Sequence, residues 1–203
     1  MTAVLSSKGG ALGERLPAVV LQAELRNFTR LSEVLDAERV LKLASAFFSL
    51  AGSAIKAAGG ELFSIQNDAL VAAFRAGTPA QSAAQAMQAA LAIQREFASL
   101  GERWKTDYGF PAAVSVGLHL GDTIFGMAGP QGGEQYVAFG DAVSIAERLV
   151  HRARAGEIVL SVQVMKALGA SAANLGAQAL PPLELGKRPP IAIYGVLRET
   201  RLD

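Results

Sequence analysis

The chain has 203 residues, of which 51% are hydrophobic, so it has enough apolar material to build one sizeable core. Its 19 Lys and Arg residues almost balance its 18 Asp and Glu residues, which excludes a global charge that would draw the chain to nucleic acid or to an acidic membrane surface. Cysteine is absent, and this excludes disulfides, thiolate metal sites and cysteine nucleophiles.

Two further features concern the location of the protein. Charged residues are expected to interrupt every apolar segment before it reaches the roughly 18 to 20 residues that cross a bilayer. The first 13 residues have no basic region followed by an apolar one, so they do not resemble a secretory signal. The sequence therefore predicts a soluble, cytoplasmic protein with no membrane partner.

The first predicted element after a loose N-terminal arm, residues 1–16, is a buried strand. The stretch from residue 18 begins as an apolar run rich in Val and Leu, and it ends on the carboxylate of Glu24. Asn27 and Thr29 can both cap a following helix, so backbone N–H groups should point outward just beyond the carboxylate. This arrangement suits a metal ion that carries phosphates, and a plain surface acid at a strand end is the alternative.

A helix and a hairpin follow this strand. The helix can be capped by Asp36 and ends at a pair of glycines. Two strands come next, residues 61–65 and 69–74, and Asn67 between them tolerates the left-handed backbone of a tight turn. The pattern therefore predicts that Asp68 lies at the tip of a β-hairpin.

The second half of the chain alternates helices and strands. A long alanine-rich helix starts at Pro79, residues 112–121 predict a strand, and a further strand begins at Thr123. A glycine-rich loop and a short strand then lead to Asp141, which can cap a helix over residues 142–152.

The chain is predicted to end with a strand, a short helix and a closing hairpin. The whole order is strand, helices, hairpin, helix, hairpin, helix, strand, helix, hairpin. This order of hairpins and helices predicts an α+β domain whose mostly antiparallel sheet is covered by helices on one face.

Four blocks of sequence, taken in order, resemble the class III adenylate and guanylate cyclase catalytic domains. Residues 20–32 resemble the first signature, a strand followed by Ala-Asp-Ile-Arg-Gly-Phe-Thr, and residues 63–74 resemble the second, Lys-Phe-Ile-Gly-Asp-Ala-Val-Met-Ala-Val-Phe. Residues 116–121 and 136–149 match the third and fourth blocks. The resemblance implies one cyclase-like domain over residues 17–203, with a ferredoxin-like core.

The resemblance also implies a set of site residues. Two acids bind paired magnesium or manganese ions in the family, and they fall on Glu24 and Asp68, with the backbone carbonyl of Leu25 as a further metal ligand. The other family positions fall on Asn27, Phe28 and Thr29 for the phosphates, Lys187 for a phosphate-contacting lysine, Ser144 and Arg148 for the transition-state pair, and Ser64 and Val137 for the base-reading pair.

For an active member, the resemblance implies a phosphorus-oxygen lyase of cyclic-nucleotide signalling. The ribose 3′-hydroxyl of a nucleoside triphosphate, with ATP favoured, attacks the α-phosphorus to give a 3′,5′-cyclic nucleotide and pyrophosphate. In the family the transition-state pair comes from a partner subunit, so a homodimer with sites at its interface is implied.

Three departures from the family pattern leave two hypotheses open. Glu24 replaces aspartate and moves the carboxylate outward by roughly 1.5 Å. Ser64 and Val137 provide no charged pair to read a base, and Ser144 replaces asparagine, where one lost donor costs about 10² to 10³ in rate. The domain is either a divergent cyclase or a pseudo-cyclase that binds a nucleotide or a partner without turnover.

A diguanylate cyclase is a further possibility that the pattern does not favour. The run Gly59-Gly60-Glu61-Leu62-Phe63 resembles the signature of that family superficially. In that family the glycines form a hairpin tip, whereas here they are predicted to end a helix.

Overall fold

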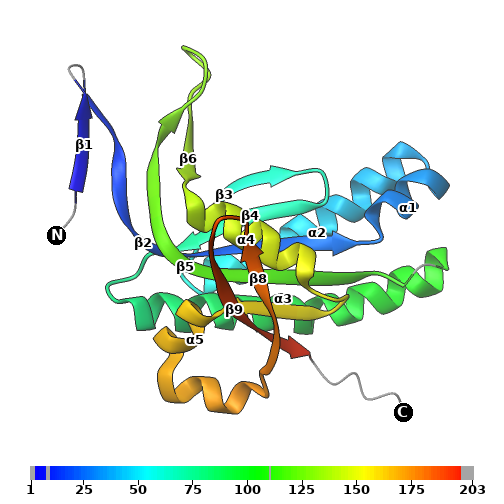
Figure 1. Cartoon of the computed structure of the whole chain (residues 1–203). Helices are drawn as coiled ribbons and strands as arrows, with labels where there is room; N and C mark the ends of the chain where they lie inside the picture. Colours follow the sequence, from blue (N-terminus) through cyan, green and yellow to red (C-terminus); the bar gives the residue numbers. More distant parts are fainter. Residues whose placement is uncertain (1–2, 8–9, 110, 198–203) are drawn as a thin grey trace.

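The computed structural model describes residues 3–7, 10–109 and 111–197 (Figure 1). The strands are β1 (Ala3–Ser7), β2 (Gly10–Arg26), β3 (Glu61–Gln66), β4 (Ala69–Phe74), β5 (Ala113–Ala128), β6 (Gln135–Phe139), β7 (Glu157–Ser161), β8 (Gln178–Leu185) and β9 (Arg188–Leu197). The helices are α1 (Phe28–Val34), α2 (Ala37–Ala57), α3 (Pro79–Tyr108), α4 (Asp141–Arg152) and α5 (Val162–Leu168), and a 3-10 helix runs over Gly169–Leu175.

The strands form one nine-stranded sheet, whose main path is β3-β4-β2-β5-β7-β9-β8. Two strands lie off this path, since β1 pairs with β2 and β6 pairs with β5. Within the described residues, β5 and β7 are the one parallel pair, and the other pairings are antiparallel. The predicted α+β class with a mostly antiparallel sheet is confirmed.

Strand β2 lies in the middle of the sheet, and its side chains alternate between the two faces. Successive side chains of a strand point to opposite faces. Leu21 therefore packs in the main core with α2 and α3, whereas Val20 packs on the other face against Ala142 and Ala146 of α4. Glu24 lies four residues after Val20 and so shares the α4 face.

The helices cover both faces of the sheet, so the prediction of one covered face is wrong. Helices α2, α3 and α5 pack on the main core, and α4 packs on the opposite face (Figure 1). Gly117 of β5 allows α4 to approach closely, because a Cβ at this position would overlap the backbone of Ala146 and Val150. The α4 face carries the candidate site.

Two strands are longer than the sequence indicated. Residues 3–7 and 10–16, expected within a loose arm, form β1 and the first part of β2. Strand β5 is continuous where two strands were predicted, because β2 pairs with it from Glu14 opposite Phe125 to Arg26 opposite Ala113. The ladder thus runs without a break past the predicted strand end.

Helix α2 follows its predicted cap. The carboxylate of Asp36 accepts a hydrogen bond from the backbone N–H of Arg39 at 2.9 Å. Contrary to expectation, α2 is long and apolar enough to cross a membrane by length and composition alone, and it is the single such helix among the described residues. In this fold its apolar face, including Phe47 and Ile55, is buried in the core.

Other local predictions met mixed outcomes. Asn67 has a φ of 51° in the β3–β4 turn, and α3 starts at Pro79, both as predicted. The residue that caps α4 is Gly140 and not Asp141, whose carboxylate instead binds Arg188 on β9 at 2.5 Å. The closing hairpin is confirmed as β8 and β9, while the 3-10 helix before it was not predicted.

Candidate active site

The two predicted metal-binding acids lie next to each other. Glu24 on β2 pairs with Ala69 of β4, directly after the β3–β4 turn that holds Asp68. The backbone N–H of Leu25 donates to the backbone carbonyl of Asp68 at 2.8 Å. Burial raises the pKa of Asp68 above its ordinary value, and the negative charge of Glu24 raises it further. The fold thus brings two carboxylates from distant segments together.

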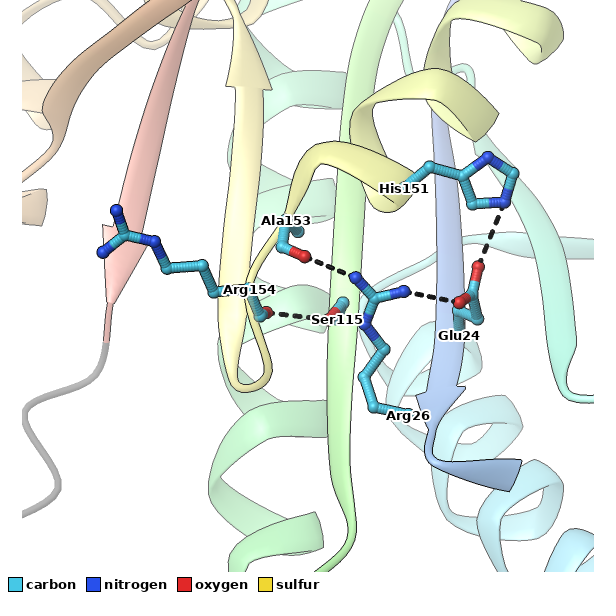
Figure 2. Close-up of polar contacts among 6 residues, drawn as sticks. All are labelled: Glu24, Arg26, Ser115, His151, Ala153 and Arg154. Atoms are coloured by element: carbon cyan, nitrogen blue, oxygen red, sulfur yellow. Dashed lines mark hydrogen bonds and ion pairs between the residues drawn. The ribbon is translucent and has the colours of Figure 1, made fainter. Parts of the chain in front are cut away.

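Both oxygens of Glu24 contact nitrogen groups (Figure 2). Oε1 accepts a hydrogen bond from Nη1 of Arg26 at 2.7 Å, and Oε2 lies 3.3 Å from Nε2 of His151. Nη2 of Arg26 also donates to the backbone carbonyl of Ala153 at 2.5 Å. The Glu24 side chain is 14% exposed, so these contacts compensate a largely buried charge and tie β2 to the end of α4.

A second contact holds the segment that follows α4. The hydroxyl of Ser115, which lies opposite Glu24 in the β2–β5 ladder, donates to the backbone carbonyl of Arg154 at 2.8 Å. Figure 2 shows this bond beside the Arg26 contact to Ala153. Two successive carbonyls after α4 are therefore fixed to β2, which carries Glu24, and to its neighbour β5.

The donor types of the acid pair suit a hard divalent cation. Carboxylate oxygens and a backbone carbonyl, here that of Leu25, are the ligands that magnesium prefers. Within the described residues there is no group of three or more His, Cys, Asp or Glu side chains that could hold a metal ion. A metal at Glu24 and Asp68 would therefore take further ligands from water or phosphate, and it would replace Arg26 and His151 at the oxygens of Glu24.

A cavity of about 360 Å³ lies on the same face of the sheet. It gathers three predicted site positions from three elements: Ser64 of β3, Val137 of β6 and Ser144 of α4. Gln22 of β2 and Glu147 of α4 also line it. The base-reading positions and the transition-state donor position thus share one cavity, which the two acids do not line.

Two predicted catalytic side chains lie away from this cavity. Nη1 of Arg148 contacts the backbone carbonyl of Glu184 on β8 at 3.4 Å. Lys187 is exposed in the turn between β8 and β9, and it is the next residue, Arg188, whose side chain reaches α4. In the single chain, the fold does not bring Arg148 or Lys187 to the acid pair.

The predicted phosphate segment starts helix α1 in an unexpected way. Asn27 precedes the helix with a left-handed backbone, φ 67°, and makes no side-chain cap. Its Nδ2 donates instead to the backbone carbonyl of Pro111 at 3.0 Å. Phe28 and Thr29 are the first two residues of α1. The prediction that Asn27 or Thr29 caps this helix by its side chain is therefore wrong.

Three residues of the site were not singled out from the sequence. Arg26 and Gln22 each lie two residues from Glu24, so the period of a strand indicates that all three share one face. His151 lies one turn after Arg148 on α4. The sequence carries no signal for His151, because the contact depends on which face of the sheet α4 covers.

A sequence model of the family described as "Adenylate and Guanylate cyclase catalytic domain" matches residues 15–191. The chain belongs to this family. The cyclase "Adenylate cyclase 1" of Rhizobium meliloti (strain 1021) is 27% identical over 143 residues, which are 70% of this chain and 21% of that protein. This cyclase domain therefore spans about a fifth of the length of that relative.

Solved cyclase structures share the fold. The adenylyl cyclase CyaB from P. aeruginosa superposes with a TM-score of 0.84 at 22% identity, over 93% of this chain and 97% of that one. The guanylate cyclase domain of RhGC from Catenaria anguillulae, in complex with GTP, gives a TM-score of 0.75 at 21% identity, over 89% of this chain and 95% of that one. At these identities the matches establish the architecture of this cyclase domain.

Proposed function

We propose that this cyclase domain converts a nucleoside triphosphate, with ATP preferred, to a 3′,5′-cyclic nucleotide and pyrophosphate, in cytoplasmic cyclic-nucleotide signalling. The observation that carries the proposal is the pairing of Glu24 and Asp68 on the sheet face that also holds the cavity of Ser64, Val137 and Ser144. The name of the Rhizobium relative supports ATP over GTP.

The acid pair would hold two divalent ions, magnesium or manganese, through Glu24, Asp68 and the carbonyl of Leu25. When bound, these ions supply charge shielding for the phosphates and a lowered pKa for the attacking 3′-hydroxyl. Arg26 and His151 occupy the oxygens of Glu24 until the nucleotide complex forms. This role fits their contacts with both of its oxygens.

The segment Asn27, Phe28 and Thr29 would contact the phosphates. It lies directly after β2, within five residues of Glu24, so phosphates bound near the acid pair come within reach of it. Ser144 would donate to the reacting centre, and Arg148 and Lys187 would stabilise the negative charge that develops on the phosphates.

A complete site requires a second copy of the chain. The acid pair does not line the cavity, and Arg148 and Lys187 lie away from the acids. We therefore propose a two-fold symmetric homodimer, in which the acids of one subunit face the cavity and the basic residues of its partner. Each of the two clefts then holds one nucleotide.

A pseudo-cyclase that binds nucleotide without turnover is the second candidate. The specific observation in its favour is that Ser64 and Val137 leave the cavity without the charged base-reading pair of the family. The contacts of Arg26 and His151 with both oxygens of Glu24 also favour this candidate, because they occupy the oxygens that a metal ion would need. In this case the domain would act as a regulatory module that binds a nucleotide or a partner.

One experiment separates the two functions. Purified protein is incubated with manganese and each of ATP, GTP, CTP and UTP, and cyclic products are identified by mass spectrometry. We expect 3′,5′-cyclic AMP as the main product, and none from an Asp68→Ala variant. Retained binding of manganese-ATP without any cyclic product would establish the pseudo-cyclase, and the absence of triphosphate binding would reject both.

A further inference from the structure

Gln22 is a buried polar residue for which the fold provides no partner. Its side chain lies on the same face of β2 as Glu24, because the two residues are two positions apart. It is 7% exposed and lines the cavity with Ser64, Val137 and Ser144. Within the part of the chain that the structure describes, its carboxamide makes no hydrogen bond, and its polar atoms stay accessible from the cavity.

The other buried glutamine of the domain shows what a structural role looks like. Gln94 of α3 is 8% exposed, and its Nε2 donates to the backbone carbonyl of Val114 at 2.6 Å. Buried amides are normally paired in this way, because an unpaired one has lost its hydrogen bonds to water without replacement. The amide of Gln22 has no protein partner and stays open to the cavity, so a ligand there can replace water as its hydrogen-bond partner.

We propose that Gln22 reads the base of the bound nucleotide, in place of the charged pair that Ser64 and Val137 lack. This inference rests on the proposed function and names the group that selects the substrate. A carboxamide offers one acceptor oxygen and two N–H donors. Adenine presents a ring-nitrogen acceptor beside an exocyclic amino donor, and a glutamine amide pairs with such an edge through two hydrogen bonds. The volume of about 360 Å³ is in the range of small-molecule sites.

The neighbouring polar groups of the cavity fit this role less well. Ser64 carries a single hydroxyl, and Val137 carries no polar atom. Gln66 and Glu147 also line the cavity, but their side chains are exposed and can bind water. Gln22 is therefore the lining residue that combines an amide with burial, and burial is what makes a mismatched base costly.

The substitution Gln22→Glu gives a directional test. A carboxylate accepts hydrogen bonds and donates none, so it loses the bond to the ring nitrogen of adenine. Guanine presents two adjacent donors, its ring N–H and its amino group, and a carboxylate can accept both. We expect the ratio of ATP to GTP affinity to fall by about 5- to 150-fold, the range of one good bidentate pair. Gln22→Leu removes both bonds and should weaken ATP binding and abolish the preference.

The measurement is binding of 3′-deoxy-ATP and 3′-deoxy-GTP with manganese, by titration calorimetry. These probes lack the attacking hydroxyl, so affinity is measured without turnover. Gln66→Glu is the matched control, since it adds the same charge to the same cavity at an exposed position. We expect it to change both affinities alike. Melting temperatures show that the variants fold, and Gln22→Leu remains informative if the buried carboxylate of Gln22→Glu prevents folding.

The outcomes separate this inference from the proposed function. A wild-type preference for 3′-deoxy-ATP that falls in both Gln22 variants and persists in Gln66→Glu supports the assignment. Wild-type binding whose base ratio is unchanged by either Gln22 substitution would overturn the assignment and leave the cyclase proposal standing. Wild-type protein that binds neither probe would overturn the proposed function itself.

Discussion

The acid pair and the cavity lie on one face of the sheet but are held in different ways. Both oxygens of Glu24 contact Arg26 and His151, and the turn at Asp68 is bonded to the backbone of β2. The cavity is lined mostly by uncharged groups, among them an unpaired amide at Gln22, with Glu147 as its carboxylate. A buried charge needs a partner whatever the protein does, so the fold itself stabilises the acid pair. Uncharged residues that line a cavity need no ion-pair partner, so they can be substituted without loss of the fold.

The largest expected effect tests whether these two regions form one site across a dimer. Asp68→Ala and Arg148→Ala chains should each be nearly inactive, because each lacks one half of both clefts. Mixed together, they should recover about a quarter of wild-type activity, since half of randomly formed dimers have one intact cleft. Activity is measured as cyclic nucleotide formed after the mixed dimers are verified.

The control for this mixing uses two variants of the acid pair. Asp68→Ala mixed with Glu24→Ala leaves one damaged acid in every cleft, whichever chains pair. Since both acids belong to the same half of a cleft, no recovery is expected. Equal recovery in the two mixtures, or none in either, would contradict the shared site.

The next effect concerns the cavity alone. Ser144→Asn restores the longer donor of the family pattern, and the rate of cyclisation should rise by up to about 10² to 10³. The affinity for 3′-deoxy-ATP should change little, because the donor acts on the reacting centre. Ser64→Lys is the companion variant: it should alter which triphosphate is preferred more than the maximal rate. An unchanged rate in a folded Ser144→Asn dimer would favour the pseudo-cyclase.

A smaller effect is expected at the acid pair. Arg26→Gln removes a positive charge from Oε1 of Glu24, so manganese should bind about two- to fivefold more tightly. Free manganese is measured by electron paramagnetic resonance during titration. Arg152→Gln removes the same charge from an exposed position of α4 and should leave the affinity unchanged. Equal shifts in both variants would show a general charge effect.

The smallest effect concerns the ion pair between Asp141 of α4 and Arg188 of β9, which anchors α4 beside the cavity. The hydrogen bond from Arg188 lowers the pKa of Asp141 below its ordinary value of 3.8, so the ionised form stabilises the fold above that pH, and this stabilisation is lost as the pH falls through the lowered pKa. Asp141→Asn should lower the melting temperature slightly at pH 7 in low salt. The difference should vanish in 1 M salt, because the pair is exposed.

A second charge variant completes this measurement. Asp107→Asn removes a carboxylate from the end of α3, far along the chain from the Arg188 pair. Its melting temperature should keep the pH dependence of the wild type, because the Asp141–Arg188 pair is intact. If Asp141→Asn behaves like Asp107→Asn, the ion pair does not anchor α4.

The sequence predicted the elements that depend on local chemistry. The cap at Asp36 and the left-handed turn at Asn67 could be predicted because each follows from one residue and its immediate neighbours. The hairpin tip at Asp68 followed from that turn. What could not be predicted was the face of the sheet that α4 covers, because a helix with an apolar stripe fits either face. The contact between His151 and Glu24 depends on this choice.

The candidate site also has features that the sequence predicted and features that it did not. The family resemblance indicated Glu24 and Asp68 as a pair, and the β2–β4 register brings them together. Arg26 follows from strand periodicity alone. The path of Asn27 toward Pro111 could not be foreseen, since it depends on where the end of α3 brings the chain back to the sheet. Long-range placement, and not local propensity, limited the prediction.

The close approach at Gly117 gives α4 the mechanics of a lever. The backbone of α4 rests on β5 at Ala146 and Val150, with Ser144 on one side of this fulcrum and His151 on the other. A tilt about the fulcrum lifts one arm as it lowers the other. Any force that tilts α4 therefore moves Ser144 in the cavity and His151 beside Glu24 in opposite directions, so in the proposed dimer one α4 would couple the two clefts.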